Sequence, residues 1–503
     1  MHAATGGAAT GRAATKLVCT IGPASESRIG ELIAAGMSVA RLNFSHGSPT
    51  EHAARVQAIR QAAKAAGREV AILSDLPGPK VRLGALAGGE VTLEAGATFT
   101  LLAGLASLTG DGDATRSATT HDGLARDLAV GDHVQLSDGA VELVVRSIEG
   151  RSIETVVERG GTIRSRAGVN VPAERLSLPP LGERDRSLAG LAVEIGIDLV
   201  GQSFVRTAAD VEDLRSLLGT GGPAIVAKIE TRPAVEQFES VARAADAIMV
   251  ARGDLGLELP FEAVPLVQKR LVATAVALGK PVIVATQMLE SMLTAGRPTR
   301  AEVSDVANAV LDGADAVMLS GETAIGAYPV LAAEAAVRIA RAAEDGAGDY
   351  HAATVNHSAQ PGDALAVAAV ALAATDPEVT CLVAAGRVPR VAVAAASRRP
   401  HVPIVAVVPD RRIARRLLLV RGVSPVIPAD AGVARDPGAV AGDALLADPA
   451  VRAALPPAGR AVVVAGSGEG TVERIEAVRI PAATEDADAA ESADTAGAAD
   501  RAG

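Results

Sequence analysis

The sequence predicts an α/β fold: a (β/α)₈ TIM barrel with an inserted small β-barrel lid domain and a C-terminal open α/β domain. Three observations lead to this prediction. From about residue 14 to residue 345, short apolar runs alternate with amphipathic segments of helical period. Residues 83–170 interrupt that series, because apolar and polar side chains alternate there and Gly and Asp separate the runs. After residue 346, a further series of apolar runs and helices begins.

Eight apolar runs account for the barrel. Near-continuous apolar strands separated by amphipathic helices are typical of a parallel sheet that is buried on both faces. Eight such strands are the number needed to close a (β/α)₈ barrel. Helical periodicity between them is clearest at 50–67, 208–219 and 263–279. The runs are 16–22, 38–44, 69–76, 197–204, 224–230, 247–254, 281–287 and 316–323.

The same patterns divide the chain into domains. The low-complexity ends have little to bury, so we expect them to be disordered. The C-terminal domain is inferred from apolar runs at 380–386, 403–410, 424–428 and 461–466. The expected segments are a disordered N-terminus (1–13), the barrel (14–82 and 171–345), the lid (83–170), the C-terminal α/β domain (346–481) and a disordered acidic tail (482–503).

Composition excludes several classes of partner. The 503 residues carry 48 Lys+Arg against 59 Asp+Glu, a net charge of −11, and only 1% aromatic residues. An acidic protein with few stacking aromatics is not expected to bind nucleic acid. Cys19 and Cys381 lie far apart and suggest a reducing compartment. No apolar run is long enough to span a membrane, and the first residues lack an apolar signal core, so we expect a soluble cytoplasmic protein.

Polar residues gather at the ends of the predicted strands. In a (β/α)₈ barrel the active site forms at the carboxyl ends of the strands. Strand-capping charges that face solvent would explain one or two of these residues, but they explain the whole set poorly. The residues are Arg41, Asn43, Ser45, His46, Asp75, Lys228, Glu230, Arg252, Asp254, Thr286, Gln287, Ser320 and Glu322.

Two of these carboxylates and one lysine suggest a metal-assisted reaction. Glu230 and Asp254 follow successive predicted strands, and a site with two protein carboxylates suits Mg²⁺, which keeps waters and takes substrate oxygens. Strand alternation places Lys228 on the same face as Glu230. An ammonium beside a metal suits a developing enolate or a transferring phosphoryl group. Two alternatives remain: the acids are ordinary surface groups, or Lys228 merely pairs with Glu230.

Seven motifs in order closely resemble the pyruvate kinase family. The resemblance covers the barrel from about residue 14 to 345 and continues more weakly through the lid and the C-terminal domain. Seven motifs in family order are far more specific than one short pattern. They are KLVCTIGPAS (16–25), GMSVARLNFSHG (36–47), SDLPGPKVRLG (74–84), IVAKIETRPAVE (225–236), AIMVARGDLGLELP (247–260), KPVIVATQMLESM (280–292) and RPTRAEVSDVANAVLDGADAVMLSGETAIGAYP (297–329).

The resemblance implies the fold predicted above and a reaction of glycolysis. Phosphoenolpyruvate would pass its phosphoryl group to ADP, giving ATP and an enolate that is protonated to pyruvate. By motif position, Arg41 would hold the phosphoryl group and Lys228 would stabilise the transition state. Glu230 and Asp254 would bind Mg²⁺, with Mn²⁺ as a substitute. The field of the metal, Lys228 and the arginines would let an acidic protein bind two anionic substrates.

The resemblance also implies the rest of the site and the assembly. The enolpyruvate end would contact three residues: Gly253, Asp254 and Thr286. Thr286 lies where the family relays a proton. Three further residues would face the nucleotide: Asn43, His46 and Arg82. The family commonly forms homotetramers, and we expect the same of this chain.

The chain departs from the family near the monovalent-cation position. Most members need K⁺, which lies among residues that match Asn43, Ser45, Asp75 and the carbonyl of Leu76, where many members carry Thr. K⁺-dependent members typically have Glu where this chain has Lys80. A fixed ammonium there would supply the positive charge that K⁺ otherwise provides. We therefore expect activity without K⁺; the alternative is a solvent-facing Lys80 with no catalytic role.

The lid and the effector region depart further. Ala167 replaces a lysine often assigned to nucleotide contact, and Arg164 or Arg166 would have to compensate. The stretch 383–390 lacks the hydroxyl groups of the family's phosphate loop, and residues 465–480 form what we expect to be a reduced effector loop. Lost hydroxyl and backbone donors weaken an anion site. We therefore do not expect regulation by fructose 1,6-bisphosphate.

Two other functions remain as alternatives. One is a catalytically silent relative that serves as a binding or regulatory subunit, which the altered lid and effector loop would allow. The other is a different Mg²⁺-dependent barrel enzyme acting on phosphoenolpyruvate or pyruvate, which would need neither Arg82 nor the lid. The complete set of residues at the barrel mouth favours the active phosphotransferase.

Overall fold

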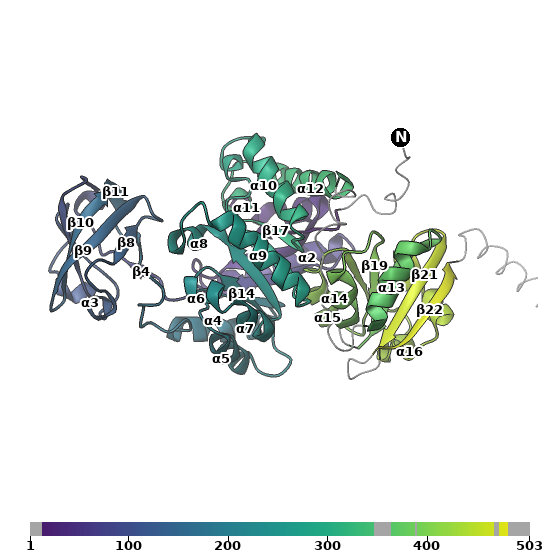
Figure 1. Cartoon of the computed structure of the whole chain (residues 1–503). Helices are drawn as coiled ribbons and strands as arrows, with labels where there is room; N and C mark the ends of the chain where they lie inside the picture. The colour runs from purple at the N-terminus through teal and green to yellow at the C-terminus, as the bar shows by residue number, and fades with distance from the viewer. Residues whose placement is uncertain (1–12, 347–363, 388–389, 467–471, 481–503) are drawn as a thin grey trace, which may run out of the picture.

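The structure is a computed structural model that describes residues 13–346, 364–387, 390–466 and 472–480. Figure 1 shows a central barrel with a β domain on one side and an α/β domain on the other. The two ends predicted to be disordered lie outside the described residues, apart from residue 13. Among the described residues, no helix combines the length and the apolar character that a membrane crossing requires.

The barrel consists of eight parallel strands that close in the order β1-β17-β16-β15-β14-β13-β3-β2. Each predicted apolar run forms one of them, and almost every strand residue is buried, which explains the continuous apolar composition. Side chains of small and medium size, such as Val18, Ala71 and Met249, fill the interior. The strands are β1 (Lys16–Thr20), β2 (Met37–Asn43), β3 (Ala71–Asp75), β13 (Leu199–Gln202), β14 (Ala224–Ile229), β15 (Ala247–Ala251), β16 (Val282–Ala285) and β17 (Ala316–Leu319).

Helices follow the strands, and several begin at capping boxes. Ser48 accepts a hydrogen bond from the N–H of Glu51, whose side chain accepts one from Ser48 N, so α2 begins cleanly. The strand predicted over 247–254 is wrong at its end, because Arg252 already begins α8. The helices are α1 (Ile29–Ala35), α2 (Pro49–Ala65), α4 (Glu183–Glu194), α5 (Ala208–Leu218), α6 (Arg232–Glu236), α7 (Phe238–Ala244), α8 (Arg252–Glu258), α9 (Val264–Ala277), α10 (Arg300–Leu311), α11 (Gly321–Ala324) and α12 (Pro329–Gly346).

The inserted β domain follows β3 and therefore lies at the carboxyl end of the barrel strands. Seven of its strands pair in the order β4-β12-β8-β9-β10-β6-β7, and a bridge between Leu83 and Thr119 links the two edges. The pairs are antiparallel as predicted, except that β6 and β7 run parallel. The elements are β4 (Val81–Arg82), β5 (Glu90–Leu93), β6 (Thr98–Leu102), β7 (Arg116–Ala118), α3 (Leu124–Asp127), β8 (His133–Leu136), β9 (Val141–Glu149), β10 (Ser152–Arg159), β11 (Gly161–Arg164) and β12 (Gly168–Asn170).

The C-terminal domain contains a five-stranded sheet in the order β20-β19-β18-β21-β22. The four predicted runs form parallel strands, and β22 pairs antiparallel with β21. The reduced loop expected over 465–480 is wrong for residues 472–480, which form the edge strand β22, and its residues 467–471 lie outside the described residues. The elements are α13 (Ala364–Thr375), β18 (Val379–Gly386), α14 (Arg390–Ser397), β19 (Ile404–Val407), α15 (Arg411–Leu417), β20 (Val423–Val426), α16 (Ala431–Arg435), α17 (Gly442–Ala447), α18 (Pro449–Ala454), β21 (Gly459–Gly466) and β22 (Val472–Ile480).

This domain packs against the amino ends of the barrel strands. Leu419 is 1% exposed and packs among the interior side chains of the barrel. Asp315, which precedes β17, pairs with both terminal nitrogens of Arg399 at 2.9 and 3.0 Å. Its oxygens also accept the N–H groups of Val282 at 3.1 Å and Arg421 at 3.0 Å. The amino end of the barrel is thus closed by apolar and ionic contacts, and the opposite end carries the lid.

Candidate active site

Arg41 and Asp75 form an ion pair at the carboxyl ends of neighbouring strands. Arg41 lies in β2, and its Nε and Nη2 donate to Asp75 Oδ2 at 3.0 and 2.7 Å. Arg41 Nη1 donates to Thr20 Oγ1 at 3.0 Å. Burial alone would raise the pKa of Asp75, but Arg41 and Lys228 hold it below its usual value. Asp75 Oδ1 is buried without a hydrogen-bond partner, and it occupies the space that a Cβ at Gly201 would need.

Lys228 in β14 lies beside this pair. Its Nζ donates to Ser203 Oγ at 2.6 Å and lies 3.5 Å from Asp75 Oδ2 and 3.3 Å from Glu230 Oε2. Burial alone would lower the pKa of Lys228, but the surrounding carboxylates, Asp75 first among them, raise it. The side chain is therefore a fixed positive charge at the barrel mouth.

Glu230 has the features of a metal ligand. Its side chain is buried, Oε1 accepts the N–H of Phe204 at 2.7 Å, and Oε2 has no hydrogen-bond partner. Burial raises the pKa of Glu230 to about 7; Lys228 opposes this shift, and the charge of Asp254 adds to it. Two carboxylates that repel each other, one with a buried oxygen that accepts no hydrogen bond, suit a divalent cation with oxygen ligands. Glu230 and Asp254 therefore fit such an ion.

Gly253 and Thr286 meet at the next two strand ends. The N–H of Gly253 donates to Thr286 Oγ1 at 2.8 Å, and that hydroxyl donates to the carbonyl of Ala285 at 2.6 Å. Asp254 lies in the first turn of α8, where the helix dipole favours a carboxylate. The structure thus brings together the residues that were predicted to hold the enolpyruvate end.

Two oxygens of the monovalent-cation position already accept hydrogen bonds within the chain. Asn43 Oδ1 accepts the N–H of Ser45 at 3.0 Å, and the carbonyl of Leu76 accepts a hydrogen bond from Ser203 Oγ at 2.7 Å. Lys80 is exposed, and its Nζ lies 5.9 Å from the ring centroid of Phe204. No hydrogen bond or ion pair joins the Lys80 side chain to the other residues described in the structure, but its charge lowers the pKa of Glu230.

The predicted nucleotide residues are more dispersed. His46 is exposed after β2, and Arg82 is exposed in β4, where its Nη1 donates to the carbonyl of Arg166 at 3.2 Å. Neither side chain shares a hydrogen bond or ion pair with Lys228 or Glu230 in the described part of the chain. Ala167 is partly buried against the apolar core of the lid.

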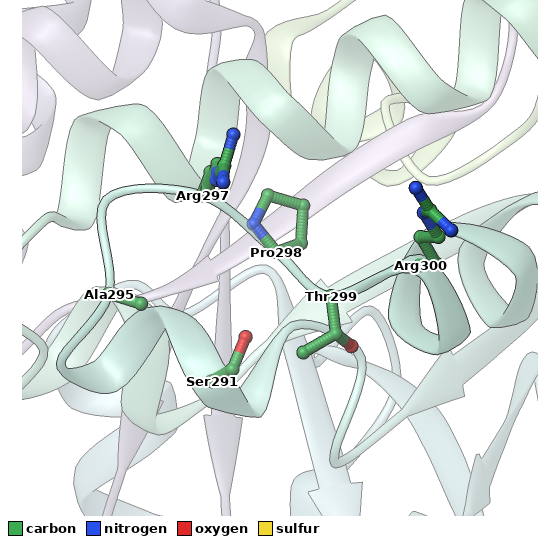
Figure 2. A pocket seen from close by; sticks show the side chains of 6 residues that line it. All are labelled: Ser291, Ala295, Arg297, Pro298, Thr299 and Arg300. Atoms are coloured by element: carbon green, nitrogen blue, oxygen red, sulfur yellow. The ribbon is translucent and has the colours of Figure 1, made fainter.

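A surface pocket lies away from these residues. It has a volume of about 510 Å³ and lies between η4 (Glu290–Leu293) and the start of α10 (Figure 2). None of the predicted site residues lines it. Its lining residues are Ser291, Ala295, Arg297, Pro298, Thr299 and Arg300.

Ser203 belongs to the site but was not predicted, whereas Glu322 was predicted there and has a structural role. Ser203 links Lys228 to the carbonyl of Leu76, and its position at the end of the predicted run 197–204 was the available signal. Glu322, which was grouped with the polar strand ends, is fully buried and accepts the N–H groups of Leu289 at 3.0 Å and Ser320 at 2.7 Å. Glu322 therefore joins the last two strand ends and stabilises the fold.

Comparison with known proteins decides the family. Family models described as "Pyruvate kinase, barrel domain" and "Pyruvate kinase, alpha/beta domain" match residues 12–333 and 363–480. This chain belongs to the pyruvate kinase family. The pyruvate kinase of Mycobacterium intracellulare is 50% identical over 334 residues, which cover 66% of this chain and 70% of the relative. That of Bacillus licheniformis is 43% identical over 419 residues, which cover 81% of this chain and 71% of the relative.

Solved structures agree with the sequence comparison. The crystal structure of a pyruvate kinase from Cryptosporidium parvum matches with a TM-score of 0.83 at 34% identity, covering 93% of this chain and 96% of that chain. The predicted fold, a barrel with an inserted β domain and a C-terminal α/β domain, is confirmed. As a pyruvate kinase, the enzyme is a phosphotransferase.

Proposed function

We propose that the enzyme transfers the phosphoryl group of phosphoenolpyruvate to ADP and forms pyruvate and ATP. The observation that carries this proposal is the Lys228 ammonium, 3.3 Å from the buried Oε2 of Glu230, which accepts no hydrogen bond. The bond between phosphorus and the enol oxygen breaks, an oxygen of the ADP β-phosphate bonds to phosphorus, and the enolate takes a proton on its terminal carbon. Fixed positive charge stabilises the oxygen on which negative charge develops.

Each residue of the mouth has a proposed role. Arg41 binds the phosphoryl group, and Lys228 neutralises the enolate oxygen. Glu230 and Asp254 hold Mg²⁺, for which Mn²⁺ can substitute; when bound, the ion adds positive charge near the transferring group. Thr286 delivers the proton, and the backbone of Gly253 holds the carboxylate end of the substrate.

Three further residues are assigned to the nucleotide. We assign Asn43, His46 and Arg82 to ADP because Asn43 ends β2, His46 follows that strand, and Arg82 lies in the first strand of the lid, all on the carboxyl side of the barrel. His46 and Arg82 are exposed and therefore accessible to a ligand. With Ala167 in the lid, the guanidinium groups of Arg164 or Arg166 would supply the remaining positive charge.

We further propose that the reaction proceeds without K⁺ because Lys80 supplies the charge. The support is electrostatic: Lys80 acts on the pKa of Glu230, and oxygens of Asn43 and Leu76 already accept hydrogen bonds within the chain. Turnover in a tetramethylammonium buffer should therefore change little when KCl is added. A rate that rises many-fold with KCl would contradict this proposal.

A charge reversal sharpens the test of Lys80. Lys80→Glu should make turnover depend on added KCl, because the carboxylate leaves the site short of positive charge. Lys64→Glu is the matched control: Lys64 is an exposed lysine in the last turn of α2, and its reversal should leave the K⁺ response unchanged. A K⁺ response in neither variant would remove Lys80 from the site.

The experiment that tests the main proposal is a coupled assay of ADP-dependent pyruvate formation. The enzyme should form pyruvate from phosphoenolpyruvate only when ADP and a divalent cation are present. A silent relative would show no turnover, and a different Mg²⁺-dependent barrel enzyme would consume phosphoenolpyruvate without ADP. Either result would contradict the proposal.

We propose a homotetramer in the cytoplasm. Seven large apolar side chains from α8 to α12 are exposed, among them Phe261 at 84% and Ile325 at 70%. Exposed apolar side chains are buried when subunits associate, and the others are Leu266, Val303, Leu311, Tyr328 and Leu331. Sedimentation of the full chain checks the assembly.

Regulation by fructose 1,6-bisphosphate is not expected. Part of the altered phosphate loop, residues 388–389, lies outside the described residues.

A further inference from the structure

A strained corner follows barrel strand β16. Thr286 and Gln287 adopt left-handed backbone conformations, with φ of 70° and 54°. A β-branched residue such as Thr rarely adopts this conformation. Two such residues in succession persist only where the surrounding structure holds them. The contacts around this corner therefore decide where the Thr286 hydroxyl lies.

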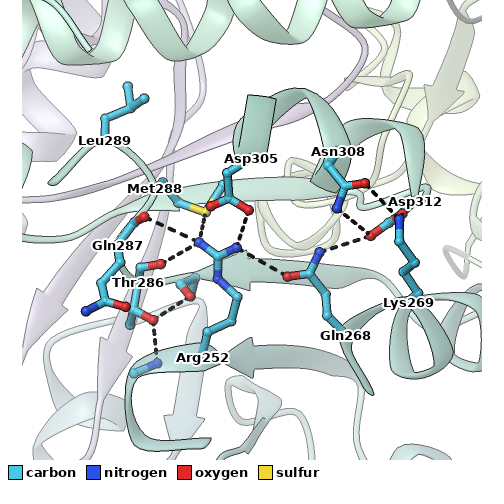
Figure 3. Close-up of polar contacts among 12 residues, drawn as sticks. Arg252, Gln268, Lys269, Thr286, Gln287, Met288, Leu289, Asp305, Asn308 and Asp312 are labelled. Carbon is cyan, nitrogen blue, oxygen red and sulfur yellow. Dashed lines mark hydrogen bonds and ion pairs between the residues drawn. The ribbon is translucent and has the colours of Figure 1, made fainter. Parts of the chain in front are cut away.

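The guanidinium of Arg252, the first residue of α8, holds the corner. Figure 3 shows its Nη2 donating to the carbonyls of Thr286 at 2.8 Å and Gln287 at 3.4 Å, and contacting Met288 Sδ at 3.0 Å. Both carbonyls are directed at one charged group. Relaxation of either residue to a right-handed conformation would turn its carbonyl away and break that hydrogen bond.

Two helices in turn hold Arg252. Its Nη1 donates to Asp305 Oδ1 in α10 at 2.6 Å and to Gln268 Oε1 in α9 at 3.3 Å. Gln268 is itself oriented by a hydrogen bond from its Nε2 to Asp312 Oδ2 at 3.0 Å. The Arg252 side chain is 12% exposed, so little solvent competes for these contacts. The guanidinium is thus fixed relative to the barrel.

The corner reaches the proposed reaction through two hydrogen bonds. The N–H of Gly253, the residue after Arg252, donates to Thr286 Oγ1, and that hydroxyl donates to the carbonyl of Ala285. Arg252 therefore controls both sides of this contact: it holds the backbone of Thr286 and also begins the helix that carries Gly253.

We propose that Arg252 is a positioning residue that holds the Thr286 hydroxyl and the Gly253 N–H in place for protonation of the enolate. The inference rests on the proposed function, because it assigns the proton transfer to Thr286. Arg252 acts through Thr286 and Gly253, and it does not act on the substrate itself. The competing explanation is that Arg252 only bridges α9 and α10 and contributes to stability alone.

The variant Arg252→Lys separates these explanations. An ammonium has its three donors on a single nitrogen, so it cannot reproduce the planar fork in which Nη1 meets Asp305 and Nη2 meets both carbonyls, and the corner is free to relax. We expect kcat, and the exchange of pyruvate methyl protons with deuterium from solvent followed by NMR with Mg²⁺ and ATP present, to fall at least about tenfold. The KM for phosphoenolpyruvate should stay within about threefold, because Arg41 and Lys228 bind the phosphoryl end.

Lys269→Gln is the matched control. Lys269 also bridges α9 and α10, since its Nζ donates to Asn308 Oδ1 at 2.8 Å and pairs with Asp312, but it does not contact the corner. Its kcat and exchange rate should stay within about twofold of the unmodified enzyme, whatever happens to its melting temperature. Wild-type kcat and exchange in Arg252→Lys would overturn the inference, as would losses in both variants that follow their melting temperatures.

A second variant covers the case in which Arg252→Lys does not fold. Asp305→Asn leaves the guanidinium on the corner carbonyls but removes the charge that orients it, and it should lower kcat at least about threefold with KM unchanged. An unchanged kcat would overturn the inference. If the unmodified enzyme formed no pyruvate from phosphoenolpyruvate and ADP, the proposed function itself would fail. An active enzyme with an unaffected Arg252 variant would overturn only the role of Arg252.

Discussion

The two ends of the barrel use buried charge in opposite ways. At the amino end, both oxygens of Asp315 accept hydrogen bonds, from Arg399 and from backbone N–H groups. At the carboxyl end, Asp75 Oδ1 and Glu230 Oε2 are buried without a hydrogen-bond partner. Unpaired buried polar atoms destabilise a fold unless a ligand completes them. Buried nitrogens of Arg399 and Arg421 also lack a hydrogen-bond partner at the amino end, but an N–H group cannot bind a cation, whereas the two carboxylate oxygens at the carboxyl end can. The carboxyl end is therefore the end that can hold a metal ion.

The difference also appears in the apolar contacts and the backbone. Leu419 of the C-terminal domain packs into the amino end of the barrel, where Arg399 is left-handed, whereas the carboxyl end carries Phe204, Thr286 and Gln287 in left-handed conformations. Several such residues clustered beside buried charge are typical of functional sites. Substitutions at the two ends should therefore separate activity from stability.

The largest expected effect is on activity, at the carboxyl end. Lys228→Met should lower kcat for pyruvate formation at least about 10³-fold, because the ammonium opposite the enolate oxygen is lost. Lys280→Met is the matched control at the amino end, where Lys280 donates to the carbonyls of Ala245 at 2.6 Å and Arg243 at 3.2 Å. The control should keep its kcat. The coupled assay of pyruvate formation measures both variants, and equal losses of kcat in the two would contradict the comparison.

The next effect is on stability, at the amino end. Asp315→Asn leaves the Arg399 guanidinium buried without its counter-charge and should lower the free energy of unfolding by about 3–5 kcal/mol. Arg399 and Asp315 are 7% and 4% exposed, so solvent screens the pair little. Urea unfolding measures the loss, and kcat at 25 °C should stay near that of the unmodified enzyme. A variant of normal stability and low activity would reverse the roles of the two ends.

A smaller effect is expected from the apolar contact. Leu419→Ala should lower stability by about 2–3 kcal/mol, because it opens a cavity between the C-terminal domain and the barrel. The loss should lie at the lower end of such substitutions, since two domains can shift to fill the space. Thermal unfolding checks it. An unchanged melting temperature would show that Leu419 does not hold the domains together.

Most of the fold was predictable because apolar runs and their spacing determine a parallel barrel. The predictions that failed concern segments in which the hydrophobic pattern gave no clear signal. β22 was expected to be a loop on the basis of family comparison, and the adjacent apolar residues Ala477 and Val478 interrupt the alternation that would have indicated a strand. The strand predicted to reach Asp254 ends three residues earlier, since short helices that begin at a strand end leave no periodic signal.

The charged residues of the site were predictable from the sequence, but the hydrogen bonds that join them to distant segments were not. Lys228 and Glu230 are close because strand alternation puts them on one face, which the sequence shows directly. The contacts of Ser203 with Lys228, and of Arg252 with the corner at Thr286, join segments far apart in the chain. No glycine marks the left-handed corner, so the sequence carries no sign of it. Contacts between such distant segments become visible only in the folded structure.

The most direct test of the account is Mn²⁺ binding, followed by electron paramagnetic resonance in the unmodified enzyme, Glu230→Gln and Lys228→Met. The account predicts that the unmodified enzyme and Lys228→Met bind the ion, and that Glu230→Gln binds it at least about tenfold more weakly. Equal Mn²⁺ affinity in Glu230→Gln and the unmodified enzyme would contradict the claim that the carboxyl end of the barrel is a metal-assisted phosphoryl-transfer site.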